Sequence, residues 1–446
     1  MVPKNDPPHV RDPLKGDEIG ASTPITSKAI PRGQKKTFSS YQHTIYMNGT
    51  KNIVPPITTN PFGWEAAAKA VMEPRDFEYA KGGAGAGETV KRNLEAFRKW
   101  SIVPRMVRGN VDISLKVTIL GEEWPSPVAI APVGVNKIFH RDGESGVARA
   151  AGTLGVPYVL STFASESPEA VAAAQDSTSE DRPAIRWLQL YWPQAVDQDV
   201  TRSILRRAKE TGYTALVITL DIFSMSWRPL DLDNAYLPLY KGASTALGFT
   251  DPVFRRKFRE KFGHEVDEDM LKGALEWENT IFPDMAHSWR ELEWLRKEWD
   301  GKILVKGIQH ATDAEFAVQA GADGIIVSNH GGRQYDGAQG SLEALHEIAA
   351  LVGDRVDVLF DSGIRTGAGI TKALALGAKA VFIGRPVVYG LGAMGEQGVL
   401  HVLRCLLADL EINLAITGVR DVSDLRPNIL RKNDAGEAQQ QRGSKL

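Results

Sequence analysis

The sequence predicts an α/β fold: a single (β/α)8 TIM barrel, with an N-terminal helical segment before it and a long insertion between strands 4 and 5. Eight short apolar runs alternate with amphipathic stretches, and each run ends beside a polar residue or a glycine. Near-continuous apolar strands that alternate with helices are typical of a parallel sheet covered on both faces. Eight such units close more economically into a barrel than they extend into an open sheet.

The expected strands are separated by enough chain for a helix to follow each of them. They span residues 128–132, 157–161, 185–191, 215–221, 303–306, 324–328, 357–361 and 380–384. The stretch 200–211 predicts one intervening helix, because Ile204, Leu205 and Ala208 share a face that the arginines and lysines avoid. Helices are also expected at 313–320 and 367–376, and before the barrel at 61–71 and 89–99, on either side of a glycine-rich turn at 79–85.

The segments outside the barrel pattern differ from it in composition. Residues 1–40 are rich in Pro, Lys, Gly and Ser and are expected to be a disordered leader, with the barrel domain at 41–430. An insertion at about 231–288 is rich in aromatic residues and is a candidate lid or subunit contact. The flexible tail 431–446 ends in Ser444-Lys445-Leu446. A peroxisomal import receptor binds this terminal tripeptide, so the sequence predicts a location in the peroxisomal matrix.

Composition argues against several classes of protein. The net charge is -2, with 53 Lys and Arg against 55 Asp and Glu, so there is no basic excess that would suit a nucleic acid or an anionic membrane. No apolar run reaches the length of a membrane span. Cys405 is the single cysteine, which excludes an intramolecular disulfide and a thiolate zinc site, and no metal site is predicted.

The most informative stretch is residues 328–334, Ser-Asn-His-Gly-Gly-Arg-Gln, which directly follows an apolar strand. It sets a titratable side chain, His330, three residues before a cation, Arg333. A base beside a fixed positive charge suits removal of a proton from an anionic substrate. Because the active site of a (β/α)8 barrel lies at the carboxyl ends of its strands, this pair is a candidate catalytic site.

The last two strand ends predict a second sub-site. Asp361, Gly363 and Arg365 follow the seventh strand, and Gly384 with Arg385 follows the eighth. Exposed glycine N–H groups, helix N-termini and arginines together favour a phosphate, which barrels commonly bind at this position. We therefore expect a phosphorylated ligand on one side of the barrel mouth and chemistry at His330 on the other.

With these motifs the chain resembles the FMN-dependent 2-hydroxy-acid oxidase and dehydrogenase family, over about residues 41–430. The resemblance is carried by Tyr79, Ala131-Pro132, Gln189-Leu190-Tyr191, Thr219-Leu220-Asp221, Lys306-Gly307, residues 328–334 and 361–365, and Ile383-Gly384-Arg385-Pro386. Within the family it is most similar to lactate 2-monooxygenase. That similarity rests on the glycine-rich run 82–85, on Gly134 after Pro132-Val133, on Trp227-Arg228-Pro229 and on the long insertion.

The resemblance implies a role for each matching residue. His330 would be the base, paired with Asp221, and Tyr191 would hydrogen-bond the 2-oxygen of the substrate. The substrate carboxylate would be bound by Arg228, Arg333 and the Tyr79 hydroxyl. Lys306 would stabilise negative charge on the reduced flavin. FMN would be held by Pro132, Val133, Gly134, Ser161, Gln189, Thr219, Lys306, Ser328, Asp361, Gly363, Arg365, Gly384 and Arg385. Whether His330 takes the α-proton or the hydroxyl proton stays open.

Departures from the family pattern bear on the substrate. Phe163 stands at a position that walls the substrate side chain, where relatives carry Trp or Leu, and Trp192 replaces a tyrosine. Both permit a 2-hydroxy acid of a shape other than lactate. Alternatively, Lys306 and Asp221 could form a structural ion pair, and Tyr191 could serve packing alone.

The implied activity is oxidation of a lactate-like L-2-hydroxy acid to the 2-keto acid, with molecular oxygen as acceptor and a homotetramer or larger as the assembly. If peroxide and keto acid stay trapped together, decarboxylation follows, as in lactate 2-monooxygenase. If the keto acid leaves first, the enzyme is a peroxide-releasing oxidase. A remote alternative is an aldolase in which Lys306 forms a Schiff base.

Overall fold

The computed structural model describes residues 37–108, 112–179, 182–282 and 284–433. Most of the expected leader (1–36) and the tail from 434, with Ser444-Lys445-Leu446, lie outside the described residues. The described residues from Phe38 onward form one compact unit.

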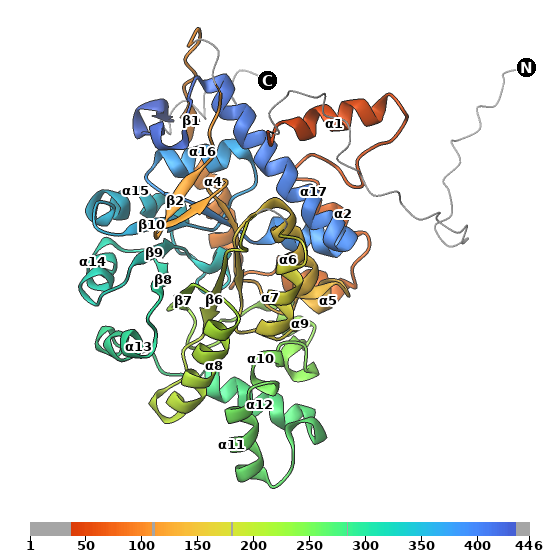
Figure 1. Ribbon diagram of the computed structural model, residues 1–446, viewed down its shortest axis with the longest axis vertical. Helices are drawn as coiled ribbons and strands as arrows, with labels where there is room; N and C mark the ends of the chain where they lie inside the picture. Colours follow the sequence, from red (N-terminus) through yellow and green to blue (C-terminus); the bar gives the residue numbers. More distant parts are fainter. Residues whose placement is uncertain (1–36, 109–111, 180–181, 283, 434–446) are drawn as a thin grey trace, which may run out of the picture. The chain divides into compact units, whose positions relative to one another are not determined.

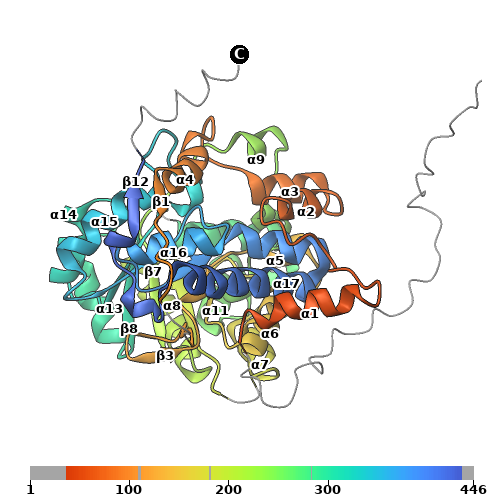
Figure 2. The same ribbon diagram turned by 90° about the horizontal axis from the view of Figure 1, so that it is seen from above.

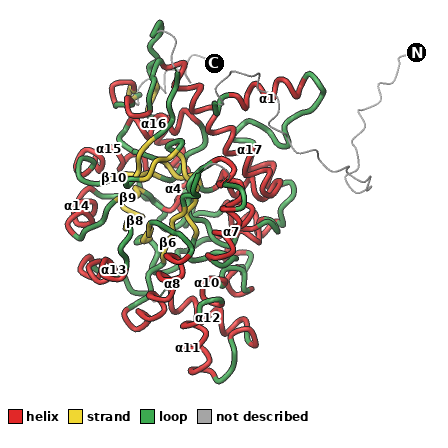
Figure 3. Tube along the Cα trace, in the orientation of Figure 1, coloured by secondary structure: helices red, strands yellow, loops and turns green. Residues whose placement is uncertain are grey.

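Eight parallel strands form a closed barrel, which confirms the predicted fold. They pair in chain order, and the last strand pairs with the first. Their bounds lie within two residues of those expected: β4 (Val128–Ile130), β5 (Tyr158–Leu160), β6 (Arg186–Leu190), β7 (Ala215–Thr219), β8 (Lys302–Ile308), β9 (Gly324–Val327), β10 (Asp357–Phe360) and β11 (Val381–Ile383). Figure 3 shows these strands inside a ring of helices.

The surrounding helices follow the strands in alternation. They are α6 (Gly143–Leu154), α7 (Pro168–Asp176), α8 (Gln198–Glu210), α13 (Leu292–Glu298), α14 (Ala311–Gln319), α15 (Ser341–Val352), α16 (Gly367–Ala375) and α17 (Arg385–Thr417), with the short α5 (Asn136–Phe139) before α6. The amphipathic pattern at 200–211 is the helix α8, whose residues Ile204, Leu205 and Ala208 are buried as predicted. None of the helices in the described part of the chain is long and apolar enough to cross a membrane.

The N-terminal helical segment contains α1 (Ser40–Gly49), α2 (Trp64–Lys69), α3 (Pro74–Lys81) and α4 (Glu88–Arg98). Helix α1 lies alongside α17 (Figure 2). The glycine-rich turn begins later than expected, at Gly82, because Tyr79 belongs to α3. Pro74 starts that helix at a position where its missing N–H costs nothing, and Phe77 and Tyr79 are buried by it.

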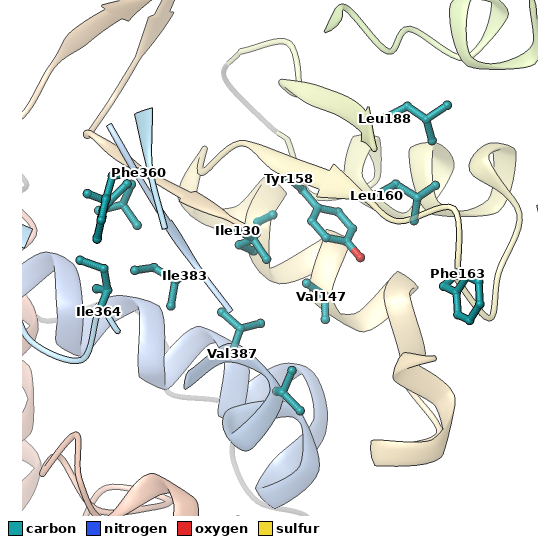
Figure 4. Close-up of a cluster of buried hydrophobic side chains, with 14 of the residues drawn as sticks. Ile130, Val147, Tyr158, Leu160, Phe163, Leu188, Phe360, Ile364, Ile383 and Val387 are labelled. Carbon is teal, nitrogen blue, oxygen red and sulfur yellow. The ribbon is translucent and has the colours of Figure 1, made fainter. Parts of the chain in front are cut away.

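The hydrophobic core has two layers. The outer layer lies between strands and helices; Figure 4 shows Ile130 and Tyr158 of neighbouring strands beside Val147 of α6. The inner layer fills the barrel and includes Ile119 and Trp124 of a hairpin, β2 (Val117–Ile119) with β3 (Glu122–Trp124). Trp124 packs on Trp187, near the start of β6, with ring centroids 5.2 Å apart. The hairpin therefore closes the amino-terminal end of the barrel and leaves the carboxyl-terminal end for a site.

The insertion between β7 and β8 has a small core of its own. It comprises α9 (Pro229–Asp233), α10 (Ala246–Phe249), α11 (Pro252–Phe262) and α12 (Met270–Ile281), followed by a return segment to α13. Phe254, Phe258 and Trp277 are fully buried inside it. In Figure 1 helices α11 and α12 lie at the bottom of the view, away from the strands. Beyond the barrel, β1 (Trp100–Ile102) pairs antiparallel with β12 (Leu430–Lys432).

Candidate active site

A cavity at the carboxyl ends of the strands brings together most of the residues singled out in the sequence. Its volume is about 1080 Å³, including its open mouth. It is lined by Tyr79, Pro132, Val133, Gly134, Tyr191, Arg228, Lys306, His330, Arg333, Asp361, Gly363, Arg365, Gly384 and Arg385. Ser161, Gln189, Thr219, Asp221 and Ser328 are buried but do not line the cavity. Two of these five residues contact lining residues through their side chains: Asp221 pairs with His330, and Ser328 accepts from Lys306 and from the N–H of His330.

His330 is paired with a fully buried carboxylate. Its Nδ1 lies 3.0 Å from Oδ1 of Asp221, whose side chain is 1% exposed. In the tautomer in which Nδ1–H donates to Asp221, Nε2 carries the lone pair. Nε2 can then accept a proton from a group bound in the cavity. Burial lowers the pKa of His330 below its usual 6.5, and the Lys306 charge adds to this, although Asp221 opposes both. The imidazole is therefore neutral at pH 7 and competent as a base.

The backbone at His330 is held in a conformation that few non-glycine residues adopt. Its φ is 58°, in the left-handed region, and the two glycines after it also have positive φ. The turn is a short 3-10 segment, η5 (His330–Gly332), and the N–H of His330 donates to Ser328 Oγ at 3.0 Å. Strain of this kind costs on the order of 1–3 kcal/mol and persists where surrounding contacts fix the turn. At His330 the turn directs the imidazole towards Asp221.

Lys306 is a buried ammonium at the end of β8. Its Nζ donates to Ser328 Oγ at 3.0 Å and lies 3.4 Å from Oδ2 of Asp361. Thr219, its register partner on β7, is also buried. The ammonium thus pairs with Asp361, while Asp221 pairs with His330, so the alternative of a structural Lys306–Asp221 pair is not what the structure shows. A buried ammonium in this cavity stabilises negative charge that develops beside it.

Two arginines form a cationic end of the cavity. Arg228 is 4% exposed, and its Nη2 donates to Gln334 Oε1 at 2.6 Å. Burial and then the neighbouring Arg333 lower the pKa of Arg228 to about 10. Arg333 donates to the backbone carbonyls of Tyr79 and Gly82, both at 2.8 Å, and stacks over the Tyr79 ring. The buried guanidinium of Arg228 beside the half-buried guanidinium of Arg333 favours an anion between them, and a carboxylate matches their planar donor geometry.

The strand ends on the other side of the cavity have donors suited to FMN. Oε1 of Gln189 accepts from Ser161 Oγ and from the N–H of Thr162, each at 3.0 Å. Its Nε2 is buried with no acceptor among the described residues. A buried amide N–H without a partner is costly, which suits a polar ring edge as its missing acceptor. Burial lowers the pKa of Arg365 and brings that of Arg385 to about 10, as expected for cations that an anion would complete.

The loop after β4 leaves no room for a side chain at Gly134. A Cβ there would lie 2.5 Å from Phe163 Cβ and 2.6 Å from the Phe163 carbonyl oxygen. The N–H of Val135 donates to that same carbonyl at 2.8 Å, so the loops after β4 and β5 are joined at this point. Gly134 and the residues flanking it therefore form one wall of the cavity in close contact with Phe163.

The sequence matches the family model described as FMN-dependent dehydrogenase over residues 68–432. The chain belongs to this family. It is 48% identical to an FMN-dependent alpha-hydroxy acid dehydrogenase of Penicillium citrinum, with 89% of this chain and 96% of that protein covered. It is 38% identical to an L-lactate oxidase of Lysinibacillus sphaericus, with 81% and 89% covered. A peroxisomal (S)-2-hydroxyacid oxidase of Arabidopsis thaliana is 35% identical, with 82% and 95% covered.

Solved structures agree with this assignment. A mandelate oxidase superposes with a TM-score of 0.71 at 33% identity, covering 84% of this chain and 99% of the other. As a member of the FMN-dependent dehydrogenase family, the protein is an FMN-dependent oxidoreductase acting on 2-hydroxy acids, and the aldolase alternative loses its support. No group of three or more His, Cys, Asp or Glu residues suited to a metal ion is found among the described residues.

Sequence patterns did not point to every residue of the cavity. Ile222 and Met225 line it from the loop after β7, and Phe282 reaches it from the insertion. Behind the lining residue Arg228, Asp231 forms an ion pair with it at 4.0 Å, and both carboxylate oxygens of Asp231 are buried without a hydrogen-bond donor among the described residues. Only Asp231 carried a usable signal, since a carboxylate three residues after an arginine shares a helix face with it.

Proposed function

We propose that the protein oxidises a small L-2-hydroxy acid, lactate-like, to the 2-keto acid with molecular oxygen as acceptor. The observation that carries the proposal is that a neutral base, His330, lines the same cavity as the neighbouring cations Arg228 and Arg333. The arginines suit the substrate carboxylate, so the carbon next to it lies within reach of the base.

The residues divide the work between binding and proton transfer. Arg228, Arg333 and the Tyr79 hydroxyl bind the carboxylate, and the Tyr191 hydroxyl donates to the 2-oxygen. Burial holds the pKa of Tyr191 well above its usual 10, so the phenol stays protonated and able to donate. Nε2 of His330 accepts a proton from the substrate, and Asp221 stabilises the imidazolium that forms. Whether the proton leaves carbon or oxygen is left open.

FMN, when bound, supplies the acceptor for the two electrons of the substrate. The chain would hold it with Pro132, Val133, Gly134, Ser161, Gln189, Thr219 and Ser328 around the ring, and with Asp361, Gly363, Arg365, Gly384 and Arg385 around the ribityl chain and phosphate. Lys306 would stabilise negative charge on the ring. The lowered pKa values of Arg365 and Arg385 support the phosphate assignment, since an anion restores the charged forms.

The fate of the keto acid separates two outcomes. Retention beside peroxide gives decarboxylation, as in lactate 2-monooxygenase, and early release gives a peroxide-producing oxidase. The insertion supports retention, because its return segment brings Phe282 to the cavity. The tail Ser444-Lys445-Leu446 supports the oxidase, because the peroxisomal matrix is where peroxide is handled. We propose that location, with import through this tripeptide, and a homotetramer or larger assembly.

A visible spectrum before and after anaerobic addition of L-lactate tests the function. A flavin band that bleaches supports it, and admission of air followed by assays of peroxide and carbon dioxide separates the two outcomes. Absence of a flavin band after reconstitution with FMN overturns the proposal. A band that no L-2-hydroxy acid bleaches overturns the substrate class and leaves the cofactor.

A further inference from the structure

Among its described residues, the insertion contributes Phe282, which follows α12, to the lining of the cavity. Its ring lies 4.8 Å from the ring of Tyr191 and 5.1 Å from that of Phe163, centroid to centroid. Phe163 and Tyr191 are themselves edge-to-face at 5.5 Å. The three rings come from the loops after β5 and β6 and from the insertion, and all three line the cavity that His330 also lines. They form an aromatic cluster, Phe163–Tyr191–Phe282.

The return segment of the insertion is fixed to the barrel close to this cluster. His287 stacks on Trp192 with ring centroids 4.2 Å apart, and its Nε2 lies 2.7 Å from the Trp192 carbonyl oxygen. Its Nδ1 lies 3.2 Å from Oε1 of Glu291, and Trp294 also stacks on Trp192, with ring centroids 6.3 Å apart. Since Trp192 directly follows Tyr191, this attachment holds Phe282 at the end of β6.

The aromatic cluster gives the cavity an apolar wall, and Ile222 and Met225 are further apolar lining residues. The charged lining residues are those already assigned to the carboxylate, the proton and the cofactor. Phe282 is 7% exposed and Ile222 is 6% exposed. A hydroxyl or a second carboxylate on the substrate side chain would lose its water there without a partner, at a cost that apolar side chains do not incur.

We propose that Phe282 is a specificity-determining residue, which gives the insertion a direct part in selecting the substrate. The inference rests on the proposed function and deepens it. The substrates are L-2-hydroxy monocarboxylic acids with an apolar side chain, and the ring of Phe282 sets the largest side chain that fits. Side chains bearing a charge are rejected at the same place.

The test compares kcat/KM across L-lactate, L-2-hydroxybutyrate, L-2-hydroxyisocaproate, L-3-phenyllactate and L-malate. F282A is expected to raise the ratio of kcat/KM for L-3-phenyllactate to that for L-lactate by about 10-fold or more, the scale on which one or more carbons in a pocket are discriminated. F282W is expected to lower the ratio of kcat/KM for L-2-hydroxyisocaproate to that for L-lactate. Binding of the matching 2-keto acids, measured by the change they cause in the flavin spectrum, should show the same shifts in Kd.

L275A is the matched control, since Leu275 is an exposed residue of α12, the helix that Phe282 follows, and does not line the cavity. F282L replaces F282A if removal of the whole side chain prevents folding. The inference is overturned if the flavin bleaches with 2-hydroxy acids in every variant while these ratios stay at the wild-type value. It is also overturned if L-malate is oxidised as well as L-lactate. Failure of every acid to bleach the wild-type flavin would instead be a failure of the proposed function.

Discussion

His330 combines a strained backbone, a buried carboxylate partner and a lowered pKa, and each of these bears on its work as a base. We expect H330A to slow anaerobic bleaching of the flavin by L-2-hydroxy acid by about 10²- to 10⁴-fold, the range that general-base catalysis contributes. The flavin spectrum should be retained, because the ring-binding residues are unchanged. H346A, at an exposed histidine of α15, is the control in stopped-flow measurements. A rate within a few-fold of wild type would remove His330 from the mechanism.

The pH dependence follows from the direction of the His330 shift. Because burial lowers its pKa below 6.5, kcat/KM should rise with pH through a value below 6.5 and be level near pH 7. Below that pKa the imidazole is protonated and cannot accept a proton, so activity is lost on acidification.

Removal of the Asp221 charge should shift the acid limb of the kcat/KM–pH profile, the part in which activity falls on acidification, to lower pH. The carboxylate raises the pKa of His330, so in D221N that pKa falls further, and the acid limb of kcat/KM moves to lower pH while the plateau rate drops. A limb that moves to higher pH would contradict the assigned pairing. Anaerobic stopped-flow rates between pH 4.5 and 8 make the comparison.

At this scale the sequence was most informative where a residue lies at a strand end. His330, Lys306 and Arg365 were predictable because the carboxyl ends of parallel strands converge on one face. Phe282 was not, since it lies more than ninety residues from Tyr191 along the chain and no periodicity joins an insertion to a strand end. The pairing of Lys306 with Asp361, two strands away around the barrel, also depends on barrel closure and on no local pattern.

At the scale of the element, strand β8 contains a bulge on which the site depends. The register with β9 shifts between Lys306 and Ile308, and Gly307 between them has a φ of 105°. A Cβ at Gly307 would lie 2.7 Å from Asp221 Cβ. The bulge therefore aims Lys306 into the cavity and leaves space for Asp221 at the end of β7.

G307A should consequently damage both stability and activity. The left-handed backbone alone costs an alanine about 1–3 kcal/mol, and the contact with Asp221 adds to it. G321A is a matched control, because Gly321 has a φ of 88° and a Cβ there would meet nothing within 4 Å. Urea unfolding should show a loss for both variants and the larger loss for G307A, with kcat reduced in G307A alone. Equal losses, with activity intact in both, would count against the role of the bulge.

The elements themselves were predictable to different degrees. The eight barrel strands were found because their apolar runs are long enough to stand out between helices. The hairpin β2–β3 and the pair β1–β12 were not, because these short strands contain polar or charged residues and form no continuous apolar run, and their pairing is set by tertiary contacts. Helix α3 was not predicted, because the glycines that follow it led to a turn being expected from Tyr79 onward.

At the scale of the whole molecule, assembly and targeting can be tested together. Deletion of Ser444-Lys445-Leu446 should abolish import of the full-length protein into peroxisomes and leave kcat/KM unchanged, because the tripeptide lies outside the described residues that form the cavity. Fluorescence microscopy of a tagged chain and assays on the purified variant make the comparison. Import that survives the deletion would overturn the proposed location.

The assembly is expected to have four times the 48.8 kDa mass of one chain, or more. Sedimentation equilibrium of the holoenzyme measures it directly. A mass of one chain across the concentration range would contradict a homotetramer.

The order of strands around the barrel also constrains when the protein can finish folding. Strand β4 is made first, yet one of its two neighbours is β11, about 250 residues later in the chain. During synthesis β4 therefore presents an unpaired edge for most of the time that the ribosome needs to complete the domain, and exposed edges recruit other strands. Strand β1 likewise pairs only with β12, which is synthesised almost at the end of the described chain. A chain whose translation stalls before β11 is thus prone to aggregate. The yield of the folded protein in cells should depend on chaperones that cover the unpaired edge of β4.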